Sequence, residues 1–546
     1  MKNSDFVDST STSNATTNWP TEDWPTSTPE NLGMDSESLV ELLSFYRENK
    51  VNIHSLLIIR NGNIGLDACF YPFTPGGTVH DVASVTKSIT SVLIGIAIDQ
   101  GFIESVDQPL LSYFPERTIA NLDAYKEKIT IENLLTMTSG FHCGYQPGEK
   151  EHNEMFKSED WVQFVLDLPM ATGPGQEYAY CSGNSHLLSA VLTKATGMSM
   201  LDFARKYLFA PLGINEVIWP ADPQGITRGW GDLHLHPRDL AKIGYLYLNK
   251  GLWEGKQLLN AAWVEKSTQA QADRAAKTNT FVRPGRDYGN AWHLVSEGPF
   301  SGMYYAAGRG GQLLNVIPDA NIVTVITGGE NALLEYDGER IGEFILSISD
   351  QALPENLEGN EILQQKTEAI TAPPPPEQIH LPEIAQIISG ETFTLEENFL
   401  NFKTISLRFN GQEEAEVRFS MIDPTSDMYT QLVAPIITQL VAPMRLDGIY
   451  TFVPGRFGLS TGIKGHWDTN DDLLLTIDEI ADINVFELRM SFEADKVTIV
   501  LNEKTRLIVD ETFEGVRQNK TVNAKTVGCL KTRLLGQFLS ATVYAE

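Results

Sequence analysis

A run of four prolines, Pro373 to Pro376, is the feature that most limits how this chain of 546 residues can fold. Such a run favours extended polyproline II and acts as a semi-rigid spacer between folding units. The main domain boundary is therefore expected here. The predicted organisation is a polar N-terminal arm at 1–30, a first domain at 31–352, a Pro-rich linker at 353–385 and a second domain at 386–546.

Before the prolines, helix and strand patterns are interleaved. A strand over 53–59 leads into a turn at Asn61-Gly62. A long apolar helix is expected from Ser84 to Gln100, and two further strands at 313–317 and 322–327. Strands at both ends of the region with helices between them indicate an α+β domain.

After the prolines, apolar and polar residues alternate. Ile405, Leu407 and Phe409 form one such series, Asn410-Gly411 is a strong hairpin turn, and the alternation resumes beyond it. A period of two indicates antiparallel sheet. The second domain is therefore expected to be all-β, either a barrel or a sandwich.

Composition and charge limit the partners and the location. The formal net charge is −30, and so acidic a surface repels phosphate backbones and anionic lipid, which makes nucleic acid and membrane poor partners. No run of 18 apolar residues occurs, so no membrane span is expected. The first residues, to about Trp19, lack the apolar core of a signal peptide, which favours a cytoplasmic location.

The cysteines carry little information as a pattern. Cys69, Cys143, Cys181 and Cys529 are widely scattered, with no CxxC spacing. This arrangement indicates neither a disulfide framework nor a zinc site. A reducing compartment fits it best.

The motif Ser84-Val85-Thr86-Lys87 opens the predicted apolar helix. Residues three apart share one face of a helix, so the serine and the lysine are neighbours. A serine hydroxyl needs a base within hydrogen-bond reach, and a lysine with a lowered pKa can be that base. The positive potential of the helix N-terminus favours a developing oxyanion. The ordinary alternative is an N-cap serine followed by a surface lysine.

Two further segments can complete a site. Tyr180-Cys181-Ser182 follows a Gly-Pro-Gly turn, where a phenol can reach a cleft and relay a proton. Residues 305–311, Tyr-Ala-Ala-Gly-Arg-Gly-Gly, directly precede a strand, where glycines allow close approach of a substrate and a backbone N–H can bind an oxyanion. Taken singly, a tyrosine is usually packing and a glycine-rich segment is usually a turn.

In this order the three segments resemble the superfamily of serine β-lactamases and penicillin-binding proteins. The resemblance is greatest to the class C β-lactamase-like branch of esterases, D-amino-acid peptidases and 6-aminohexanoate-dimer hydrolases, and it covers roughly Leu32 to Ile348. Leu134 to Gly140 and Pro237 to Gly244 add to it. It implies an antiparallel sheet flanked by helices with a helical subdomain. It also implies an acyl-enzyme mechanism without a metal or an organic cofactor.

The resemblance implies a role for each motif residue. Ser84 would be the acylated nucleophile, Lys87 its proton partner and Tyr180 the second base. The N–H of Gly308 would complete the oxyanion hole with that of Ser84.

Two positions depart from the family's pattern. Ser182 stands where asparagine is usual, and Tyr305 stands where the family has lysine or histidine. The cation that would hold a substrate carboxylate is therefore missing or displaced to Arg309. This leans toward an esterase or amidase with a small ester, amide or peptide substrate. The alternatives are a D-stereospecific peptidase or β-lactam-recognising enzyme, and a non-catalytic binding or sensor protein.

Two other motifs are interpreted as structural. Gly458-Leu459-Ser460-Thr461-Gly462 matches a nucleophile elbow, but it lies in a strand-like pattern and is expected to be a β-turn. His234-Leu235-His236 has no third metal ligand near it in the sequence and is expected to be a structural pair. The role of the second domain and the oligomeric state stay open.

Overall fold

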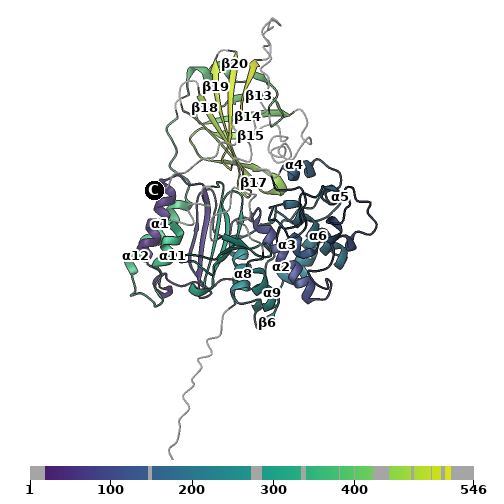
Figure 1. Ribbon diagram of the computed structural model, residues 1–546. Helices are drawn as coiled ribbons and strands as arrows, with labels where there is room; N and C mark the ends of the chain where they lie inside the picture. The colour runs from purple at the N-terminus through teal and green to yellow at the C-terminus, as the bar shows by residue number, and fades with distance from the viewer. Residues whose placement is uncertain are drawn as a thin grey trace, which may run out of the picture.

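The structure is a computed structural model with two bodies, a mixed helix–sheet body below and a β-rich body above (Figure 1). It describes residues 19–145, 150–271, 286–331, 333, 340–379, 381–398, 400–421, 442–468, 472–493, 495–505 and 511–517. Cys529 and the first 18 residues of the expected arm lie outside this part of the chain.

The first domain is built on an antiparallel sheet with strand order β2-β1-β11-β10-β9-β8-β7. The strands are β1 (Ile53–Arg60), β2 (Asn63–Cys69), β7 (Arg286–Tyr288), β8 (His293–Val295), β9 (Tyr304–Gly308), β10 (Gln312–Ile317) and β11 (Ile322–Gly328). The expected turn at Asn61-Gly62 joins β1 to β2. The sheet thus unites strands from both ends of the domain's sequence.

Helices cover both faces of this sheet (Figure 1). Leu56 and Ile58 of β1 pack with α1, α11 and α12, whereas Leu57 and Ile59 pack with α2 and α8. Because successive side chains of a strand point to opposite faces, one apolar strand serves two cores. The helices are α1 (Ser36–Glu48), α2 (Val85–Asp99), α3 (Ile131–Leu135), α4 (Lys150–Phe156), α5 (Trp161–Asp167), α6 (Ser182–Thr196), α7 (Met200–Ala204), α8 (Pro237–Leu248), α9 (Ala261–Ser267), α11 (Gly342–Ser347) and α12 (Leu357–Thr371).

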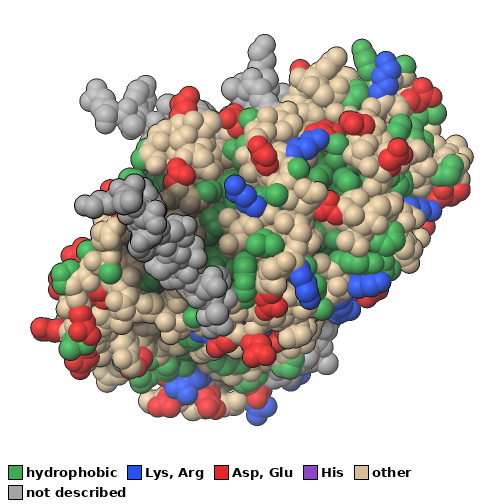
Figure 2. Space-filling view, turned by 90° about the horizontal axis from the view of Figure 1, so that it is seen from below, with side chains coloured by type: hydrophobic (Ala, Val, Ile, Leu, Met, Phe, Trp, Pro, Cys, Tyr) green, Lys and Arg blue, Asp and Glu red, His purple; other side chains and the backbone are tan. Residues whose placement is uncertain are grey.

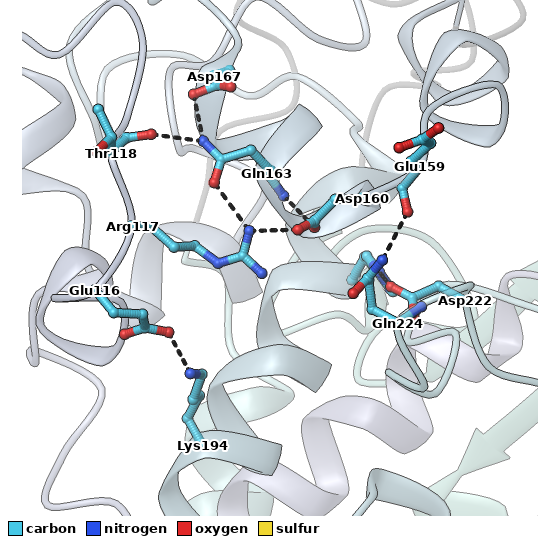
Figure 3. A network of polar contacts seen from close by, with 11 residues as sticks. Glu116, Arg117, Thr118, Glu159, Asp160, Gln163, Asp167, Lys194, Asp222 and Gln224 are labelled. Carbon is cyan, nitrogen blue, oxygen red and sulfur yellow. Dashed lines mark hydrogen bonds and ion pairs between the residues drawn. The ribbon is translucent and has the colours of Figure 1, made fainter.

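The helices on the α2 side form the expected helical subdomain, and a polar network ties it together (Figure 3). The Arg117 guanidinium donates to Asp160 at 2.8 Å and to Gln163 at 3.0 Å. Lys194 of α6 pairs with Glu116. These contacts fix α5 and α6 against the 116–118 segment, so α6 starts from a defined place.

Two segments expected to be extended or loose are partly packed. In the arm, Trp24 is buried and its indole N–H donates to the Arg238 carbonyl at 3.0 Å, so residues 19–30 lie on the first domain. In the linker, helix α12 packs on α1, and the extended stretch is 373–379. Both departures have the same cause, since apolar side chains there gain by leaving water.

The second domain is a closed β-barrel. Its strands follow the order β15-β14-β13-β12-β21-β20-β19-β18-β17-β16, and β15 also pairs with β17 through Arg445 and Lys464, which closes the sheet. The strands are β12 (Thr392–Leu395), β13 (Phe402–Phe409), β14 (Glu414–Met421), β15 (Ala442–Arg445), β16 (Thr451–Pro454), β17 (Ser460–Trp467), β18 (Asp472–Glu479), β19 (Val485–Glu493), β20 (Lys496–Glu503) and β21 (Glu511–Arg517), preceded by helix α13 (Glu383–Ile388). The expectation of an all-β domain is confirmed.

Short elements complete the fold. They are β3 (His80–Asp81), β4 (His234–Leu235), β5 (Leu252–Trp253), β6 (Lys256–Gln257), the π-helix Arg205–Phe209 and the 3₁₀ turns Glu30–Leu32, Leu110–Tyr113, Lys126–Lys128, Pro318–Ala320 and Arg456–Gly458. Among the described residues, no helix is long and apolar enough to cross a membrane. On the face drawn in Figure 2, acidic and basic side chains are interspersed and form no continuous basic patch.

Candidate active site

Ser84 lies at the N-cap of α2, directly after a tight turn. Ala83 in that turn has φ of 45°, a value uncommon for a residue with a side chain. The Asp81 carboxylate accepts the N–H of Ala83 at 2.7 Å, and the N–H of Val82 donates to the Leu233 carbonyl at 2.9 Å. Hydrogen bonds on two sides therefore fix the conformation of the turn. Ser84 is half-buried and lies at the N-terminus of α2, where the helix dipole produces a positive potential.

Lys87 contradicts the interpretation as a surface lysine. The residue is 1% exposed, and its Nζ donates hydrogen bonds to Ser84 Oγ at 2.8 Å and to the Trp230 carbonyl at 3.0 Å. Within the described residues the Ser84 side chain makes no helix-capping hydrogen bond. The serine hydroxyl and the lysine amine are thus within the hydrogen-bond distance that the predicted nucleophile and base need.

Tyr180 completes the cluster from another part of the chain. Lys87 Nζ lies 4.8 Å from the centroid of the Tyr180 ring. The tyrosine precedes α6, whose first residue, Ser182, is buried. Gly144 packs on the Tyr180 backbone so closely that a Cβ added to it would lie 1.9 Å from the Tyr180 carbonyl oxygen. The predicted nucleophile, lysine and tyrosine are therefore brought together in space.

A disulfide joins Cys143 to Cys181, the residue after Tyr180. The expectation of no disulfide was wrong, because the pairing depends on two loops that the spacing of the cysteines does not reveal. Disulfides persist in oxidising environments, so this bond removes the argument for a reducing compartment. Cys69 is a buried free thiol whose pKa is raised to about 12, by burial first and then by Asp67.

Gly308, at the end of β9, lies against the nucleophile's turn. A Cβ added there would lie 2.7 Å from the Val82 carbonyl oxygen and 2.9 Å from the Ala83 Cβ. Contacts this short exclude a side chain, so glycine is required by close approach. The backbone of Gly308 therefore lies against residues 82 and 83, directly before Ser84.

Replacing Gly308 by alanine is expected to lower kcat on the order of 10²-fold, because the added methyl pushes β9 away from the turn that carries Ser84. The measurement is steady-state ester hydrolysis with thermal unfolding alongside it. Gly231→Ala is the matched control, since its nearest neighbour, the Ala83 carbonyl oxygen, is 3.9 Å away. Equal activity of the two variants would argue against a role for the Gly308 N–H.

Arg309, the candidate for the displaced cation, is hydrogen-bonded to the barrel. Its guanidinium Nη1 donates to Asn484 at 2.8 Å and to Thr505 at 2.6 Å, both in the barrel. Tyr305, at the position of the family's cation, stacks on His293 of the neighbouring strand β8 with ring centroids 5.0 Å apart. These bonds favour an interpretation in which Arg309 holds the barrel over one in which it binds a substrate carboxylate.

His234 takes part in a buried ionic cluster that sequence spacing could not reveal. Atoms of His234, Asp81 and Asp482 lie within 4.8 Å of one another. The imidazole pairs with Asp482 at 2.9 Å, whereas His236 pairs with Glu216 at 3.1 Å. Burial alone would lower the pKa of His234, but Asp482 and then Asp81 raise it to about 9. A protonated imidazole bonds the Asp482 carboxylate, so these side chains form a buried ion-pair cluster.

The second serine motif does not form a nucleophile elbow. Ser460 begins β17, which pairs with β16 and β18, so strands lie on both sides of it where an elbow needs a helix. Ser460 instead borders a cavity of about 440 Å³ together with Cys69, His80, Arg238 and Phe452. Ser84, Lys87 and Tyr180 do not line that cavity, so it is separate from the predicted catalytic residues.

Comparison with known proteins agrees with this geometry. The Beta-lactamase family model matches residues 54–339. The 6-aminohexanoate-dimer hydrolase of Paenarthrobacter ureafaciens is 25% identical over 286 residues, which cover 50% of this chain and 71% of that protein. Penicillin-binding protein 4 of Amycolatopsis lactamdurans is 21% identical over 309 residues, which cover 51% of this chain and 79% of that protein.

One solved structure shows the likeness of fold. It is a Bacillus anthracis protein that carries the 6-aminohexanoate-dimer hydrolase name, with a TM-score of 0.50 and 18% identity. The match covers 62% of this chain and 91% of that one.

Proposed function

The chain belongs to the Beta-lactamase family of serine hydrolases, and from this premise we propose that it cleaves an ester or amide bond through an acyl-enzyme on Ser84. The observation that carries the proposal is the buried Lys87 amine, 2.8 Å from Ser84 Oγ. That distance allows direct proton transfer. The Tyr180 ring beside the same amine supports a shared role in moving the proton.

In the proposed acylation, Lys87 and Tyr180 accept the proton of Ser84 while Oγ attacks the substrate carbonyl carbon. The carbonyl oxygen gains negative charge, which the N–H groups of Ser84 and Gly308 bind. One such donor contributes roughly 10²–10³-fold to kcat in serine hydrolases. The C–O or C–N bond then breaks, and the leaving group takes the proton back from the Tyr180 side.

Deacylation repeats the sequence with water. The Lys87 and Tyr180 pair accepts a proton from a water molecule, whose oxygen attacks the acyl carbon. The bond to Ser84 Oγ breaks, Oγ regains a proton, and the free acid leaves. The protons and bonds balance over the cycle, and the enzyme returns to its starting state.

The substrate we propose is an uncharged small ester or amide. Tyr305 replaces the family's cation, and Arg309 is bonded to Asn484 and Thr505 of the barrel. A substrate carboxylate bound without a cationic partner would lose its hydration, and no ion pair would compensate for that loss. β-Lactams and peptides with a free C-terminal carboxylate are therefore expected to be poor substrates.

The test is a matched pair of p-nitrophenyl esters whose acyl chains end in a carboxylate or in its methyl ester. We expect kcat/KM for the neutral ester to be at least about tenfold higher, since tenfold corresponds to one modest ion pair. A chromogenic β-lactam and a pair of D- and L-alanine amides complete the panel. Preference for the carboxylate ester, or strict cleavage of the D-amide, would favour the β-lactam-recognising or D-peptidase alternative.

A fluorophosphonate probe read by intact mass tests the acyl-enzyme itself. One covalent adduct, mapped to the peptide that contains Ser84, is expected. A protein that shows neither turnover nor an adduct would be a non-catalytic member of the family.

A further inference from the structure

The turn between β18 and β19, residues 480–484, lies against segments of the first domain that adjoin Ser84 and Gly308. It touches the first domain at two places, and each place adjoins one of the two segments assigned to the oxyanion hole. We call these five residues the clamp turn.

The first contact is with the strand before the nucleophile. The N–H of Asp81 donates to the Ala481 carbonyl at 2.8 Å. The Asp482 carboxylate pairs with His234 at 2.9 Å, and His234 lies opposite Asp81 in the β3–β4 pair. Because the Asp81 side chain in turn holds the N–H of Ala83, two steps connect the clamp turn to Ser84.

The second contact is with the turn after β9. The Asn484 side chain accepts from Arg309 at 2.8 Å, and Arg309 directly follows Gly308. Ile483 packs on Gly310 so tightly that an added Cβ would lie 2.1 Å from its Cγ2. Asn331 continues the contact, since its amide donates to the Thr505 carbonyl while its oxygen accepts the N–H of Gly310.

The charged side chains at this contact are buried or half-buried, and each lies beside a partner of opposite charge. Arg228 and Arg456 both pair with Asp232, next to the His234–Asp482 pair. Burial raises the pKa of Glu479 to about 8, with the charge of Asp482 adding to the effect. Buried ion pairs contribute little net stability but are costly when one partner is removed or misplaced. The cluster therefore specifies one docking position for the barrel.

We propose that the clamp turn holds the Ser84 and Gly308 segments at the separation that the oxyanion hole requires, so that Arg309, Asp482 and Asn484 are positioning residues. The inference rests on the proposed function. Ser84 and Gly308 come from separate parts of the fold, and the clamp turn is bonded to both of their segments. A shift of about 1 Å in such a site can lower the reaction rate on the order of 10²-fold. A turn that fixes the distance between the Ser84 and Gly308 segments therefore affects the rate directly.

The test compares Arg309→Gln, Asn484→Ala and Asp482→Asn with the wild type. We expect kcat for a neutral p-nitrophenyl ester, and the rate of fluorophosphonate labelling, to fall about 10- to 100-fold, while KM changes less than about threefold, because oxyanion donors act in the transition state. Arg309→Lys should recover part of the loss. Arg309→Gln and Asn484→Ala together should cost less than the sum of the two single effects, since both remove the Arg309–Asn484 bond.

Controls separate positioning from folding. Arg445→Gln removes a barrel arginine that pairs with Asp447 away from the cluster, and it should leave kcat unchanged. If Asp482→Asn unfolds because it leaves His234 unpaired, Asn484→Ala still tests the proposal, since it removes no charge. Folded clamp variants with kcat within twofold of the wild type would overturn the proposal. A rise in KM alone would also overturn it, because the turn would then contact substrate and not position the hole.

Hydrogen exchange gives a readout that needs no turnover. Asn484→Ala removes the side-chain bonds to Arg309 and to Glu479 of the barrel, and it leaves the Ala481 and Asp482 contacts with the Ser84 segment in place. If the clamp turn connects both segments, exchange should nevertheless become faster in 81–87 as well as in 304–311. Faster exchange confined to 304–311 would contradict the proposal that the clamp turn connects the two segments. If the wild type shows neither turnover nor labelling, but Asn484→Ala speeds exchange in both 81–87 and 304–311, the proposed function would be rejected. The proposal that the clamp turn connects the two segments would stand.

Discussion

Replacing Ser84 by alanine is expected to remove ester turnover and fluorophosphonate labelling together. The loss in kcat should be on the order of 10⁴-fold or more, because no covalent intermediate can form and only binding and the oxyanion N–H groups remain. The variant should fold normally, since within the described residues the hydroxyl makes no capping bond and its partner is Lys87. Stability is expected to change by less than about 1 kcal/mol.

Two serines serve as controls for this prediction. Ser88 lies one turn further along α2, where its hydroxyl donates to the Ala291 carbonyl at 2.6 Å. Ser460 belongs to the motif that matches a nucleophile elbow. Alanine at either position should leave labelling and kcat within a few-fold of the wild type. Labelling that persists in Ser84→Ala but disappears in Ser460→Ala would reverse the assignment of the nucleophile.

Replacing Lys87 by methionine is expected to lower kcat on the order of 10²–10⁴-fold, the range that general acid–base groups supply. Methionine fills a similar volume in this buried site, so the main loss is the amine that bonds Ser84 Oγ and the Trp230 carbonyl. KM should change little if the lysine acts on the proton and not on substrate binding. The measurement is steady-state kinetics with the labelling rate, which should fall in parallel.

Lys126 provides a matched structural lysine for this experiment. It is fully buried like Lys87, and its ammonium donates to the carbonyls of Ala120 and Leu166, each at 2.9 Å. Lys126→Met should lower the melting temperature, because two buried carbonyls lose their donor, and should leave kcat of the folded protein unchanged. If both variants lost stability and kept kcat, Lys87 would be structural and the proton would need another acceptor.

Local patterns in the sequence predicted much of the first domain. The spacing of Ser84 and Lys87 on one apolar helix places the two side chains together through helix geometry alone. The hairpin at Asn61-Gly62 and the alternation around Ile405 likewise depend on residues close in the chain. Such features depend only on residues that are close together in the chain, so they could be predicted without knowing which distant segments are in contact.

The choice between a barrel and a sandwich was open for the opposite reason. Alternation tells which face of a strand is buried, but not which strands are neighbours. The pair Arg445 and Lys464 closes the sheet, and it depends on the path of the whole domain. The disulfide of Cys143 with Cys181 has the same origin, since two loops 38 residues apart had to meet.

The sequence by itself determined that Ser84 and Lys87 are neighbours on one helix, that they lie in a mixed helix–sheet domain and that the second domain is all-β. Helix and strand periodicity depend on residues close together in the chain, so these features could be predicted from it. Only the tertiary structure decided that Lys87 is buried beside Tyr180, that Arg309 is bonded to Asn484 and that Asp482 pairs with His234. Those contacts join residues from 93 to 248 positions apart. Charge and hydrogen-bond partners at such separations are chosen by how distant segments and the two domains pack together, which no local pattern encodes.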